Sequence, residues 1–341
     1  MIGPFTHDQP AVRIVFGAGT FERLAGELEK RRWLVVHGSS QAAAAGRLRE
    51  RLGARCAGTF GEVRRHVPVE LAERGRTHFA AVGADGLVAV GGGSAIGLAK
   101  AIALTARVPI VAVPTTYSGS ELTAVHGVTS EGRKRTGRDE AVRPRTVVYD
   151  PDLTRGLPRE IAAPSAMNAL AHCVDALWAA AATPVTTLLA VEGARALREG
   201  LDGADHEQLL YGAALGGWTF GVAGGGLHHR ICHLLGGAFD LPHAETHSAV
   251  LPQVAALNAA AAPDDAARLA AALGAADLAR GIFDLARRSG SVTALRDLGL
   301  AEERLGEVVD DVAAAAAGNP VPLDGPAARE LLARAWAGER P

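Results

Sequence analysis

The chain has 341 residues, and at about 150 residues per domain this length predicts two domains, each large enough for its own core. Its 35 basic and 37 acidic residues nearly balance, which gives no sign of the clustered positive charge that a nucleic-acid-binding surface needs. Charged residues make up 21% and apolar residues 48%, which is typical of a folded globular protein and excludes a disordered chain.

The first half of the chain alternates short apolar runs with helical patterns. The runs that we interpret as strands lie at residues 11–16, 33–37, 78–82, 87–90, 109–113 and 143–150. Helices are expected after the second run, to about residue 52, and from Ser94 to about Ala106. Continuous apolar strands suit a parallel sheet covered on both faces, and their alternation with helices favours a doubly wound α/β sheet.

The pattern changes after Asp150, Pro151 and Asp152, which interrupt the chain. From Arg159 to Ala337 it is helical almost throughout. We therefore predict an α/β domain over residues 1–152 and an all-α domain over residues 153–341.

A strand, a glycine turn and the start of a helix follow one another at residues 88–100. Gly91, Gly92 and Gly93 let a ligand approach the backbone, a helix N-terminus attracts phosphate, and Ser94 can cap the helix or bond a phosphate oxygen. The spacing matches neither the Gly-x-Gly-x-x-Gly fingerprint nor a P-loop, and a strand-to-helix turn without a ligand stays an alternative for this motif taken alone.

A second strand end strengthens the prediction of a dinucleotide site in the first domain. Thr115, Thr116, Tyr117 and Ser118 concentrate hydroxyl groups at the carboxyl end of the next strand, where open α/β sheets bind ligands. The acid that would select NAD through its ribose is expected after the first sheet strand, but residues 37–40 are His-Gly-Ser-Ser. NADH and NADPH both stay open as cofactors, and Ser39 joins the predicted cofactor contacts.

Histidines gather between residues 172 and 247 of the second domain. Asn168 and His172 are four residues apart, as are His229 and His233, so on helices each pair shares a face. His243 is expected in a loop that follows the next glycines. Imidazoles so placed can bind a divalent metal, polarise a carbonyl or donate protons, although any single one is more often a satisfied helix residue.

Three cysteines, Cys56, Cys173 and Cys232, are far apart and show no Cys-x-x-Cys spacing, which indicates neither a zinc knuckle nor a redox pair. Few cysteines and the lack of a secretory leader favour the cytoplasm, and no apolar stretch is long enough for a membrane span. We therefore expect a cytoplasmic protein whose partners are neither nucleic acid nor a membrane.

Several long blocks of sequence, in the same order, resemble the iron-containing alcohol dehydrogenase superfamily, which shares its fold with dehydroquinate synthase and glycerol dehydrogenase. The resemblance covers nearly the whole chain and looks closest to the maleylacetate reductase subfamily. The blocks are residues 91–94 (GGGS), 114–121 (PTTYSGSE), 167–172 (MNALAH), 227–237 (LHHRICHLLGG) and 240–247 (DLPHAETH). The resemblance implies a Rossmann-like sheet domain, then an all-α domain, in the dehydroquinate synthase-like fold, and a homodimer.

In metal-dependent members of this superfamily an aspartate and three histidines hold the ion, and the matching positions here are Asn168, His172, His229 and His243. A neutral amide is a poor ligand for a divalent transition metal, since it brings no charge. In having asparagine at this position, the chain resembles the maleylacetate reductases. The resemblance therefore implies NADH or NADPH as cofactor and a vestigial metal position, with no requirement for Fe or Zn.

The resemblance also implies a reaction, the NAD(P)H-dependent reduction of the carbon–carbon double bond of 2-maleylacetate to 3-oxoadipate during the degradation of aromatic compounds. Substituted dicarboxylates would fit as well. The implied catalytic residues are His243, His229, His172 and His233, and the implied substrate contacts are Asn168, Arg230, His228, His247 and Tyr117. The alternatives are a metal-dependent alcohol or polyol dehydrogenase of the same superfamily and a dinucleotide-binding paralogue without catalysis.

Overall fold

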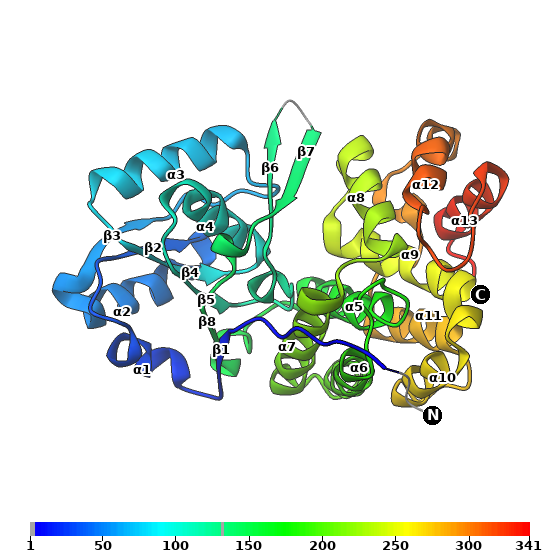
Figure 1. Ribbon diagram of the computed structural model, residues 1–341, viewed down its shortest axis with the longest axis horizontal. Coiled ribbons are helices and arrows are strands. Elements are labelled where there is room, and N and C mark those ends of the chain that lie inside the picture. Colours follow the sequence, from blue (N-terminus) through cyan, green and yellow to red (C-terminus); the bar gives the residue numbers. More distant parts are fainter. Residues whose placement is uncertain (1–3, 131–132) are drawn as a thin grey trace. The chain divides into compact units, whose positions relative to one another are not determined.

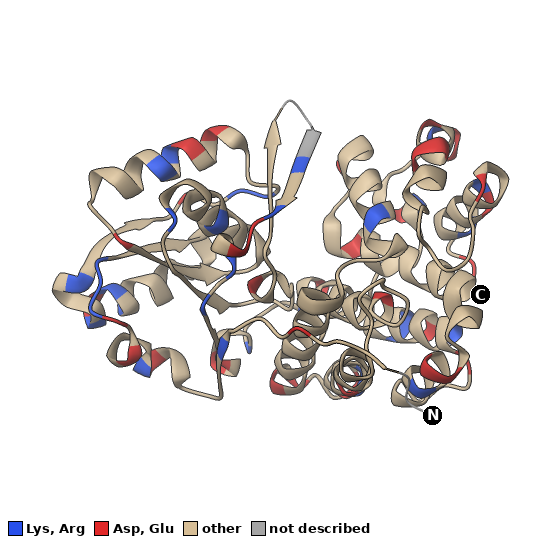
Figure 2. Cartoon of the chain, viewed as in Figure 1, with Lys and Arg blue, Asp and Glu red and all other residues tan. Residues whose placement is uncertain are grey.

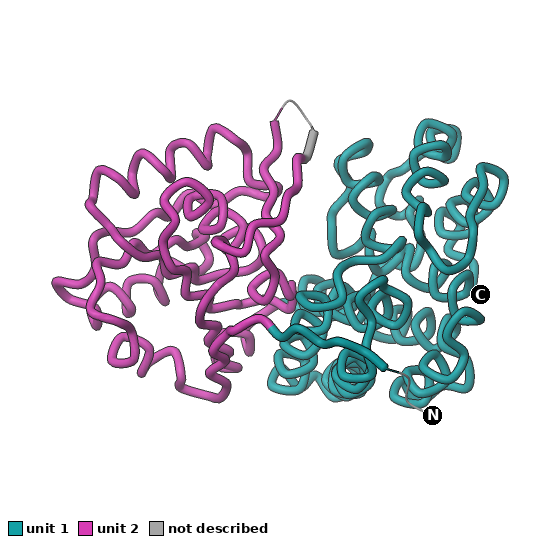
Figure 3. The backbone as a smooth tube through the Cα atoms, viewed as in Figure 1, with its two compact units in different colours: residues 1–9, 158–341 teal, residues 10–157 magenta. Residues whose placement is uncertain are grey.

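The computed structural model describes residues 4–130 and 133–341, and the chain divides into two compact units (Figures 1 and 3). One unit contains residues 10–157 and is called the α/β unit below. The other contains residues 158–341 together with residues 4–9 and is called the helical unit. The domain boundary near residue 152 was drawn from sequence composition and stays a prediction.

Six parallel strands form the main sheet of the α/β unit, in the order β1-β8-β5-β4-β2-β3. They are β1 (Arg13–Phe16), β2 (Trp33–His37), β3 (Cys56–Phe60), β4 (Gly86–Gly91), β5 (Ile110–Pro114) and β8 (Thr146–Tyr149). Every residue of β4 and β5 is buried, as their continuous apolar runs predict for strands that are covered on both faces.

Helices cover both faces of this sheet (Figure 1). On one face α1 (Thr20–Glu27) and α2 (Ala42–Leu52) pack Phe21 and Leu48 against Trp33 and Val35 of β2. On the other face lie α3 (Val69–Ala81) and α4 (Gly93–Ala106). This arrangement confirms the predicted doubly wound sheet.

Three elements of the α/β unit differ from the sequence-based interpretation. Residues 78–82 are not a strand but the end of α3, because Leu71, Gly75 and Phe79 recur at helical spacing and are buried on one side of the helix. β3 and the antiparallel hairpin of β6 (Val125–Ser130) and β7 (Arg133–Arg138) were not predicted. Their segments contain too few apolar residues to stand out as strands.

The helical unit consists of packed helices, as predicted. They are α5 (Arg159–Asp175), α6 (Pro184–Gly203), α7 (His206–Ala223), α8 (Leu227–Phe239), α9 (His243–Asn258), α10 (Pro263–Ala272), α11 (Leu278–Ser289), α12 (Val309–Ala315) and α13 (Gly325–Ala337). Helix α5 is buried on all sides from residue 162 to residue 175, so it is the core helix of this unit. Polar residues on α5 are therefore shielded from water.

Glycines bring the helices around α5 unusually close together. A Cβ atom on Gly216 of α7 would lie 2.7 Å from the carbonyl oxygen of Ala169 on α5, and one on Gly212 would lie 2.8 Å from the carbonyl oxygen of Gly193 on α6. Because the obstructing atoms are backbone, larger residues would force the helices apart. The position of α5 is therefore set by tight packing.

Two local predictions at helix starts are wrong. His243 is not in a loop but is the first residue of α9, because α8 continues through Gly236 and Gly237 to Phe239 and the connection is short. Ser94 does not cap α4, since the helix already begins at Gly93 and its N-cap residue is Gly92, without a side-chain cap.

The surface carries both signs of charge. Figure 2 shows lysine and arginine beside aspartate and glutamate on helices of both units. Within the described ranges, no helix is long and apolar enough to cross a membrane.

Candidate functional site

Three neighbouring strands of the α/β unit end at the same edge of the sheet, because β2 pairs with β4 and β4 pairs with β5 in parallel. The backbone N–H of Thr115 donates to the carbonyl oxygen of Gly91 over 3.2 Å, which ties the turn after β5 to the turn after β4. All predicted cofactor residues lie along this edge: Ser39 after β2, Gly91, Gly92, Gly93 and Ser94 after β4, and Thr115, Thr116 and Ser118 after β5.

The glycine turn has no room for side chains. Gly91 has a φ of +153°, and a Cβ atom there would lie 2.7 Å from the Cβ of Ala95. A Cβ atom on Gly92 would lie 2.8 Å from Oγ1 of Thr116. Glycine is therefore required for the chain to pass from β4 into α4 with Thr116 against the turn. The first N–H groups of α4 have no acceptor within the helix, so they can bind an anion.

The order of the strands reverses between β2 and β4. β2 is followed by β3 on one side of the sheet, whereas β4 is followed by β5 on the other side. In doubly wound sheets the crevice at such a reversal, outside the carboxyl ends of the strands, is where dinucleotides bind. The two turns beside the reversal are the glycine turn and Gly38 with Ser39, and residues 37–40 carry no carboxylate.

A buried ammonium group supports the turn after β5, and sequence reasoning missed it. Lys100 of α4 is fully buried, and its Nζ donates to the carbonyl oxygens of Ser120 and Thr123 over 2.7 and 2.8 Å. Burial lowers the pKa of Lys100 and the charge of Glu121 raises it, which leaves a value of about 7. The buried Glu121 accepts a hydrogen bond from the hydroxyl of Tyr149 over 2.9 Å. The available signal was one lysine in a helix that otherwise lacks charged residues.

Three helices of the helical unit bring imidazole rings together. His172 lies on α5, His229 and His233 on α8, and His243 and His247 on α9. Ring centres lie 4.9 Å apart for His172 and His229, and 4.7 Å apart for His229 and His247. The distances are 4.4 Å for His247 and His243 and 5.8 Å for His243 and His233. These five rings form a continuous series, which we call the imidazole row.

The imidazole row extends from the core of the helical unit to its surface. His247 is fully buried and His172 and His229 nearly so, whereas His233 is half-buried and His243 is exposed. Burial lowers the pKa of His172 and of His247 well below the usual imidazole value, and nearby imidazoles lower it further. His172 and His247 are therefore neutral near pH 7, where one ring nitrogen donates a hydrogen bond and the other accepts one.

Asp175 is a site residue that the sequence analysis missed. It is the last residue of α5, it is fully buried, and its Oδ2 lies 2.7 Å from Nδ1 of His229. Burial alone would raise the pKa of Asp175, but the hydrogen bond from His229 and the charges of the neighbouring imidazoles lower it to about 2. A signal was available, because Asp175 follows His172 by three residues and Asn168 by seven, which places all three on one helix face.

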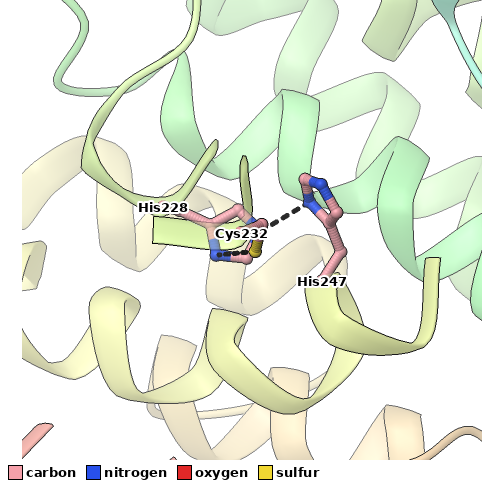
Figure 4. Close-up of side chains that lie close together, drawn as sticks. All are labelled: His228, Cys232 and His247. Atoms are coloured by element: carbon pink, nitrogen blue, oxygen red, sulfur yellow. Dashed lines mark hydrogen bonds between the residues drawn. The ribbon is translucent and has the colours of Figure 1, made fainter. Parts of the chain in front are cut away.

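His228 and His247 form a second buried pair (Figure 4). Nε2 of His228 lies 2.8 Å from Nδ1 of His247, and both rings are fully buried. The Sγ atom of Cys232 lies 3.7 Å from Nε2 and 3.9 Å from Nδ1 of His228. Burial lowers the pKa of His228 to about 3 and raises the pKa of the Cys232 thiol. All three groups are therefore uncharged near neutral pH.

The remaining predicted substrate residues have different surroundings. Asn168 is buried on α5, one helical turn before His172, and Tyr117 is fully buried in the α/β unit. Arg230 on α8 is half-buried, and its Nη1 donates to the carbonyl oxygen of Ala317 over 2.9 Å. A guanidinium has five N–H donors, so the bond to Ala317 leaves others for a substrate carboxylate, and that contact stays a prediction.

The residues at the family's metal position fit a tightly held divalent ion poorly. Asn168 offers a neutral amide where a carboxylate would stabilise the ion. Among the described residues, three ligand atoms lie within 4.8 Å of one another at His228, Cys232 and His247 instead. There the two ring nitrogens are 2.8 Å apart. Two nitrogen ligands of one tetrahedral zinc are about 3.3 Å apart, so this hydrogen bond would have to open to admit an ion.

Known proteins resemble the chain over nearly its whole length. Residues 10–151 match the model of iron-containing alcohol dehydrogenases, and residues 162–336 match the C-terminal model of the Fe-containing alcohol dehydrogenase family. A maleylacetate reductase from Burkholderia cepacia is 45% identical over 340 residues, which cover 96% of this chain and 97% of that relative.

Solved structures agree with this similarity. The crystal structure of maleylacetate reductase from Rhizobium sp. strain MTP-10005 has a TM-score of 0.94 to this chain at 42% identity, covering 99% of each chain. The enzyme from Agrobacterium tumefaciens has a TM-score of 0.92 at 41% identity, covering 100% of each chain. The chain therefore belongs to the iron-containing alcohol dehydrogenase family and, within it, to the maleylacetate reductase group.

Proposed function

We propose that this protein reduces the carbon–carbon double bond of 2-maleylacetate, or of a substituted analogue, with NADH or NADPH, and that the product is 3-oxoadipate. The observation that carries the proposal is the 45% identity to a maleylacetate reductase over 96% of the chain. The reaction would serve the degradation of aromatic compounds.

The dinucleotide is proposed to bind at the carboxyl edge of the sheet in the α/β unit. The N-terminus of α4 would hold the pyrophosphate, because Gly92 and Gly93 carry no side chain that shields the backbone. The hydroxyls of Ser94, Thr116 and Ser118 would bond phosphate oxygens. Since residues 37–40 carry no carboxylate, a 2′-phosphate would meet no like charge beside Ser39, which supports the use of either cofactor.

The reaction needs a hydrogen-bond donor and a proton source from the protein. Hydride from the nicotinamide adds to one alkene carbon, and the π electrons move onto the ketone oxygen as an enolate. A donor stabilises this oxygen, and a proton is then delivered to the neighbouring carbon. Neutral imidazole is a suitable donor in a buried site. We assign the donor role to His172 and His243, a hydrogen-bond-accepting role through Nε2 to His229, whose Nδ1 faces Asp175, and the proton to the half-buried His233.

The substrate is a dianion, so the site must also neutralise carboxylates. Arg230 is the proposed partner, since a guanidinium can bind a carboxylate through two parallel hydrogen bonds. Asn168, Tyr117, His228 and His247 complete the proposed substrate contacts. His228 and His247 would act from the buried side, because they are hydrogen-bonded to each other.

The test is an assay of NADH and NADPH oxidation with freshly generated maleylacetate, beside a panel of aldehydes, ketones and short alcohols. The proposal expects maleylacetate to be turned over far faster than any member of the panel. Preferred turnover of short alcohols, with a stoichiometric bound ion, would instead identify a metal-dependent alcohol or polyol dehydrogenase. NADPH binding without any turnover would identify a non-catalytic paralogue.

A further inference from the structure

Four N–H groups surround the carboxylate of Asp175 at the end of α5. Oδ2 accepts from the backbone N–H of Gly226 over 2.9 Å, from the backbone N–H of His229 over 3.2 Å and from Nδ1 of His229 over 2.7 Å. Oδ1 accepts from the indole N–H of Trp178 over 3.2 Å. The side chain is fully buried, so these contacts replace water as the source of stabilisation for the charge.

The arrangement fixes which nitrogen of His229 carries the proton. An ionised carboxylate only accepts hydrogen bonds, so the ring nitrogen that faces it must be the donor. Nδ1 therefore carries a proton, and the second ring nitrogen, Nε2, is the atom left to face a ligand. This Nε2 atom is buried and has no hydrogen-bond partner among the described residues. A buried polar atom without a partner is costly, which suggests that a ligand supplies the missing contact.

The orientation of the ring is fixed as well as its proton. The ring of His229 is stacked on that of His172, with an interplanar angle of 16°, and Phe220 packs against both rings at 4.5 Å between centres. The same carboxylate also binds the backbone of Gly226 and His229 at the start of α8. Asp175 therefore holds the helix start and the ring together, so that Nε2 of His229 points in one direction.

We propose that Asp175 is a positioning residue of the reductase: its carboxylate holds His229 with the proton on Nδ1 and so presents Nε2 to the substrate. This inference rests on the proposed function for the identity of the substrate. The proton arrangement of His229 does not depend on that function. The four N–H groups around Asp175 favour its ionised form, which can only accept hydrogen bonds.

The test replaces Asp175 by asparagine, which keeps the shape of the side chain and removes its charge. An amide oxygen in place of Oδ2 still accepts these hydrogen bonds but carries no charge, and an amide turned the other way offers its NH₂ group to Nδ1, so the proton of His229 is no longer held on Nδ1 alone. The expected result is a fall in kcat for maleylacetate reduction of about 10- to 100-fold, the range found when the hydrogen-bond partner of a ligating histidine is lost. The dissociation constant of NADPH should not change.

A matched control separates positioning from simple loss of a buried carboxylate. Asp150 is also buried, and its carboxylate accepts from the backbone N–H groups of Gly19 and Phe21 at the start of α1, without an imidazole partner in these contacts. Asp150→Asn should keep kcat in the folded fraction, and Asp175→Glu should restore part of the activity that Asp175→Asn loses. Equal loss of kcat in the two asparagine variants would overturn the proposal.

A second measurement reports on the proton directly. In protein labelled with ¹⁵N at histidine, the signals of His229, assigned with His229→Gln, should show the proton on Nδ1 in the wild type and a larger share of the Nε2-protonated form in Asp175→Asn. A wild-type ring protonated at Nε2 alone would refute the positioning role even if the enzyme is active. Absence of maleylacetate turnover with the expected tautomer would count against the proposed function and not against this arrangement.

Discussion

Each unit buries one charged side chain that ties a helix to a proposed functional segment, but the two charges have different partners. In the α/β unit, the ammonium group of Lys100 is surrounded by carbonyl oxygens of residues 120–125. In the helical unit, the carboxylate of Asp175 is surrounded by N–H groups, one of which belongs to His229. Lys100 therefore holds backbone in place, in residues 120–125. Asp175 holds both the backbone at the start of α8 and the imidazole ring of His229. We infer that Lys100 keeps the proposed cofactor-binding turn of the α/β unit rigid, whereas Asp175 controls the proton position on His229 in the helical unit.

Lys100→Met should give the largest effect on stability. The variant removes the ammonium group and leaves the carbonyl oxygens of Ser120, Thr123 and Val125 without this donor. A buried hydrogen-bond acceptor left without its donor costs about 1–3 kcal/mol, and with three such oxygens we expect the free energy of unfolding to fall by about 3 kcal/mol or more. Urea denaturation measures it, and NADPH titration of the folded fraction should show weaker binding because the turn after β5 is released.

The exposed Lys30 provides the control for Lys100→Met. Lys30→Met removes the same charge from the surface and should change the free energy of unfolding by less than about 0.5 kcal/mol. If Lys100→Met were as stable as Lys30→Met, the segment after β5 would not depend on the buried amino group of Lys100.

This contrast also explains what sequence reasoning could find. The strand ends of the α/β unit were predictable, because continuous apolar runs locate β2, β4 and β5 and glycine and hydroxyl residues follow them directly. Asn168 and His172 on α5, and His229 and His233 on α8, were also predicted to share helix faces. Residues four apart lie on one face of any helix, so this needs only the local sequence. The burial of Lys100 and Asp175 was not predictable in this way, because it depends on helices and loops that are distant in sequence.

The start of α9 shows the same limit. Gly236 and Gly237 suggested that a loop would precede His243, yet α8 passes through both glycines and His243 begins the next helix. Packing of α8 against the core overrides their weak helix propensity. The meeting of His229 with His247, from two different helices, therefore had to come from the structure.

The buried neutral histidines predict a pH-dependent stability of moderate size. An unfolded chain protonates an imidazole near pH 6.5, whereas burial lowers the pKa of His228 to about 3 in the folded protein. Below pH 6.5 the unfolded state therefore binds a proton that the folded state does not, and the free energy of unfolding falls as pH falls. Between pH 6.5 and pH 5 we expect His228 to contribute a loss of about 2 kcal/mol.

His228→Gln isolates this contribution, because glutamine does not titrate. Its free energy of unfolding, measured by urea denaturation at several pH values, should decrease less than that of the wild type over the same interval. The difference between the two slopes is the relevant quantity, since the variant also loses the hydrogen bond to His247. Parallel slopes would mean that His228 is not held neutral in the folded protein.

The smallest expected effect is that of metal removal. In the helical unit Asn168 brings no charge to the family's metal position, so a divalent ion would be held weakly there. Exhaustive chelation should therefore leave maleylacetate reduction and the free energy of unfolding nearly unchanged. Elemental analysis before and after treatment provides the control. Complete loss of activity that added Fe or Zn restores would show that an ion, and not the carboxylate of Asp175, governs the chemistry of His229.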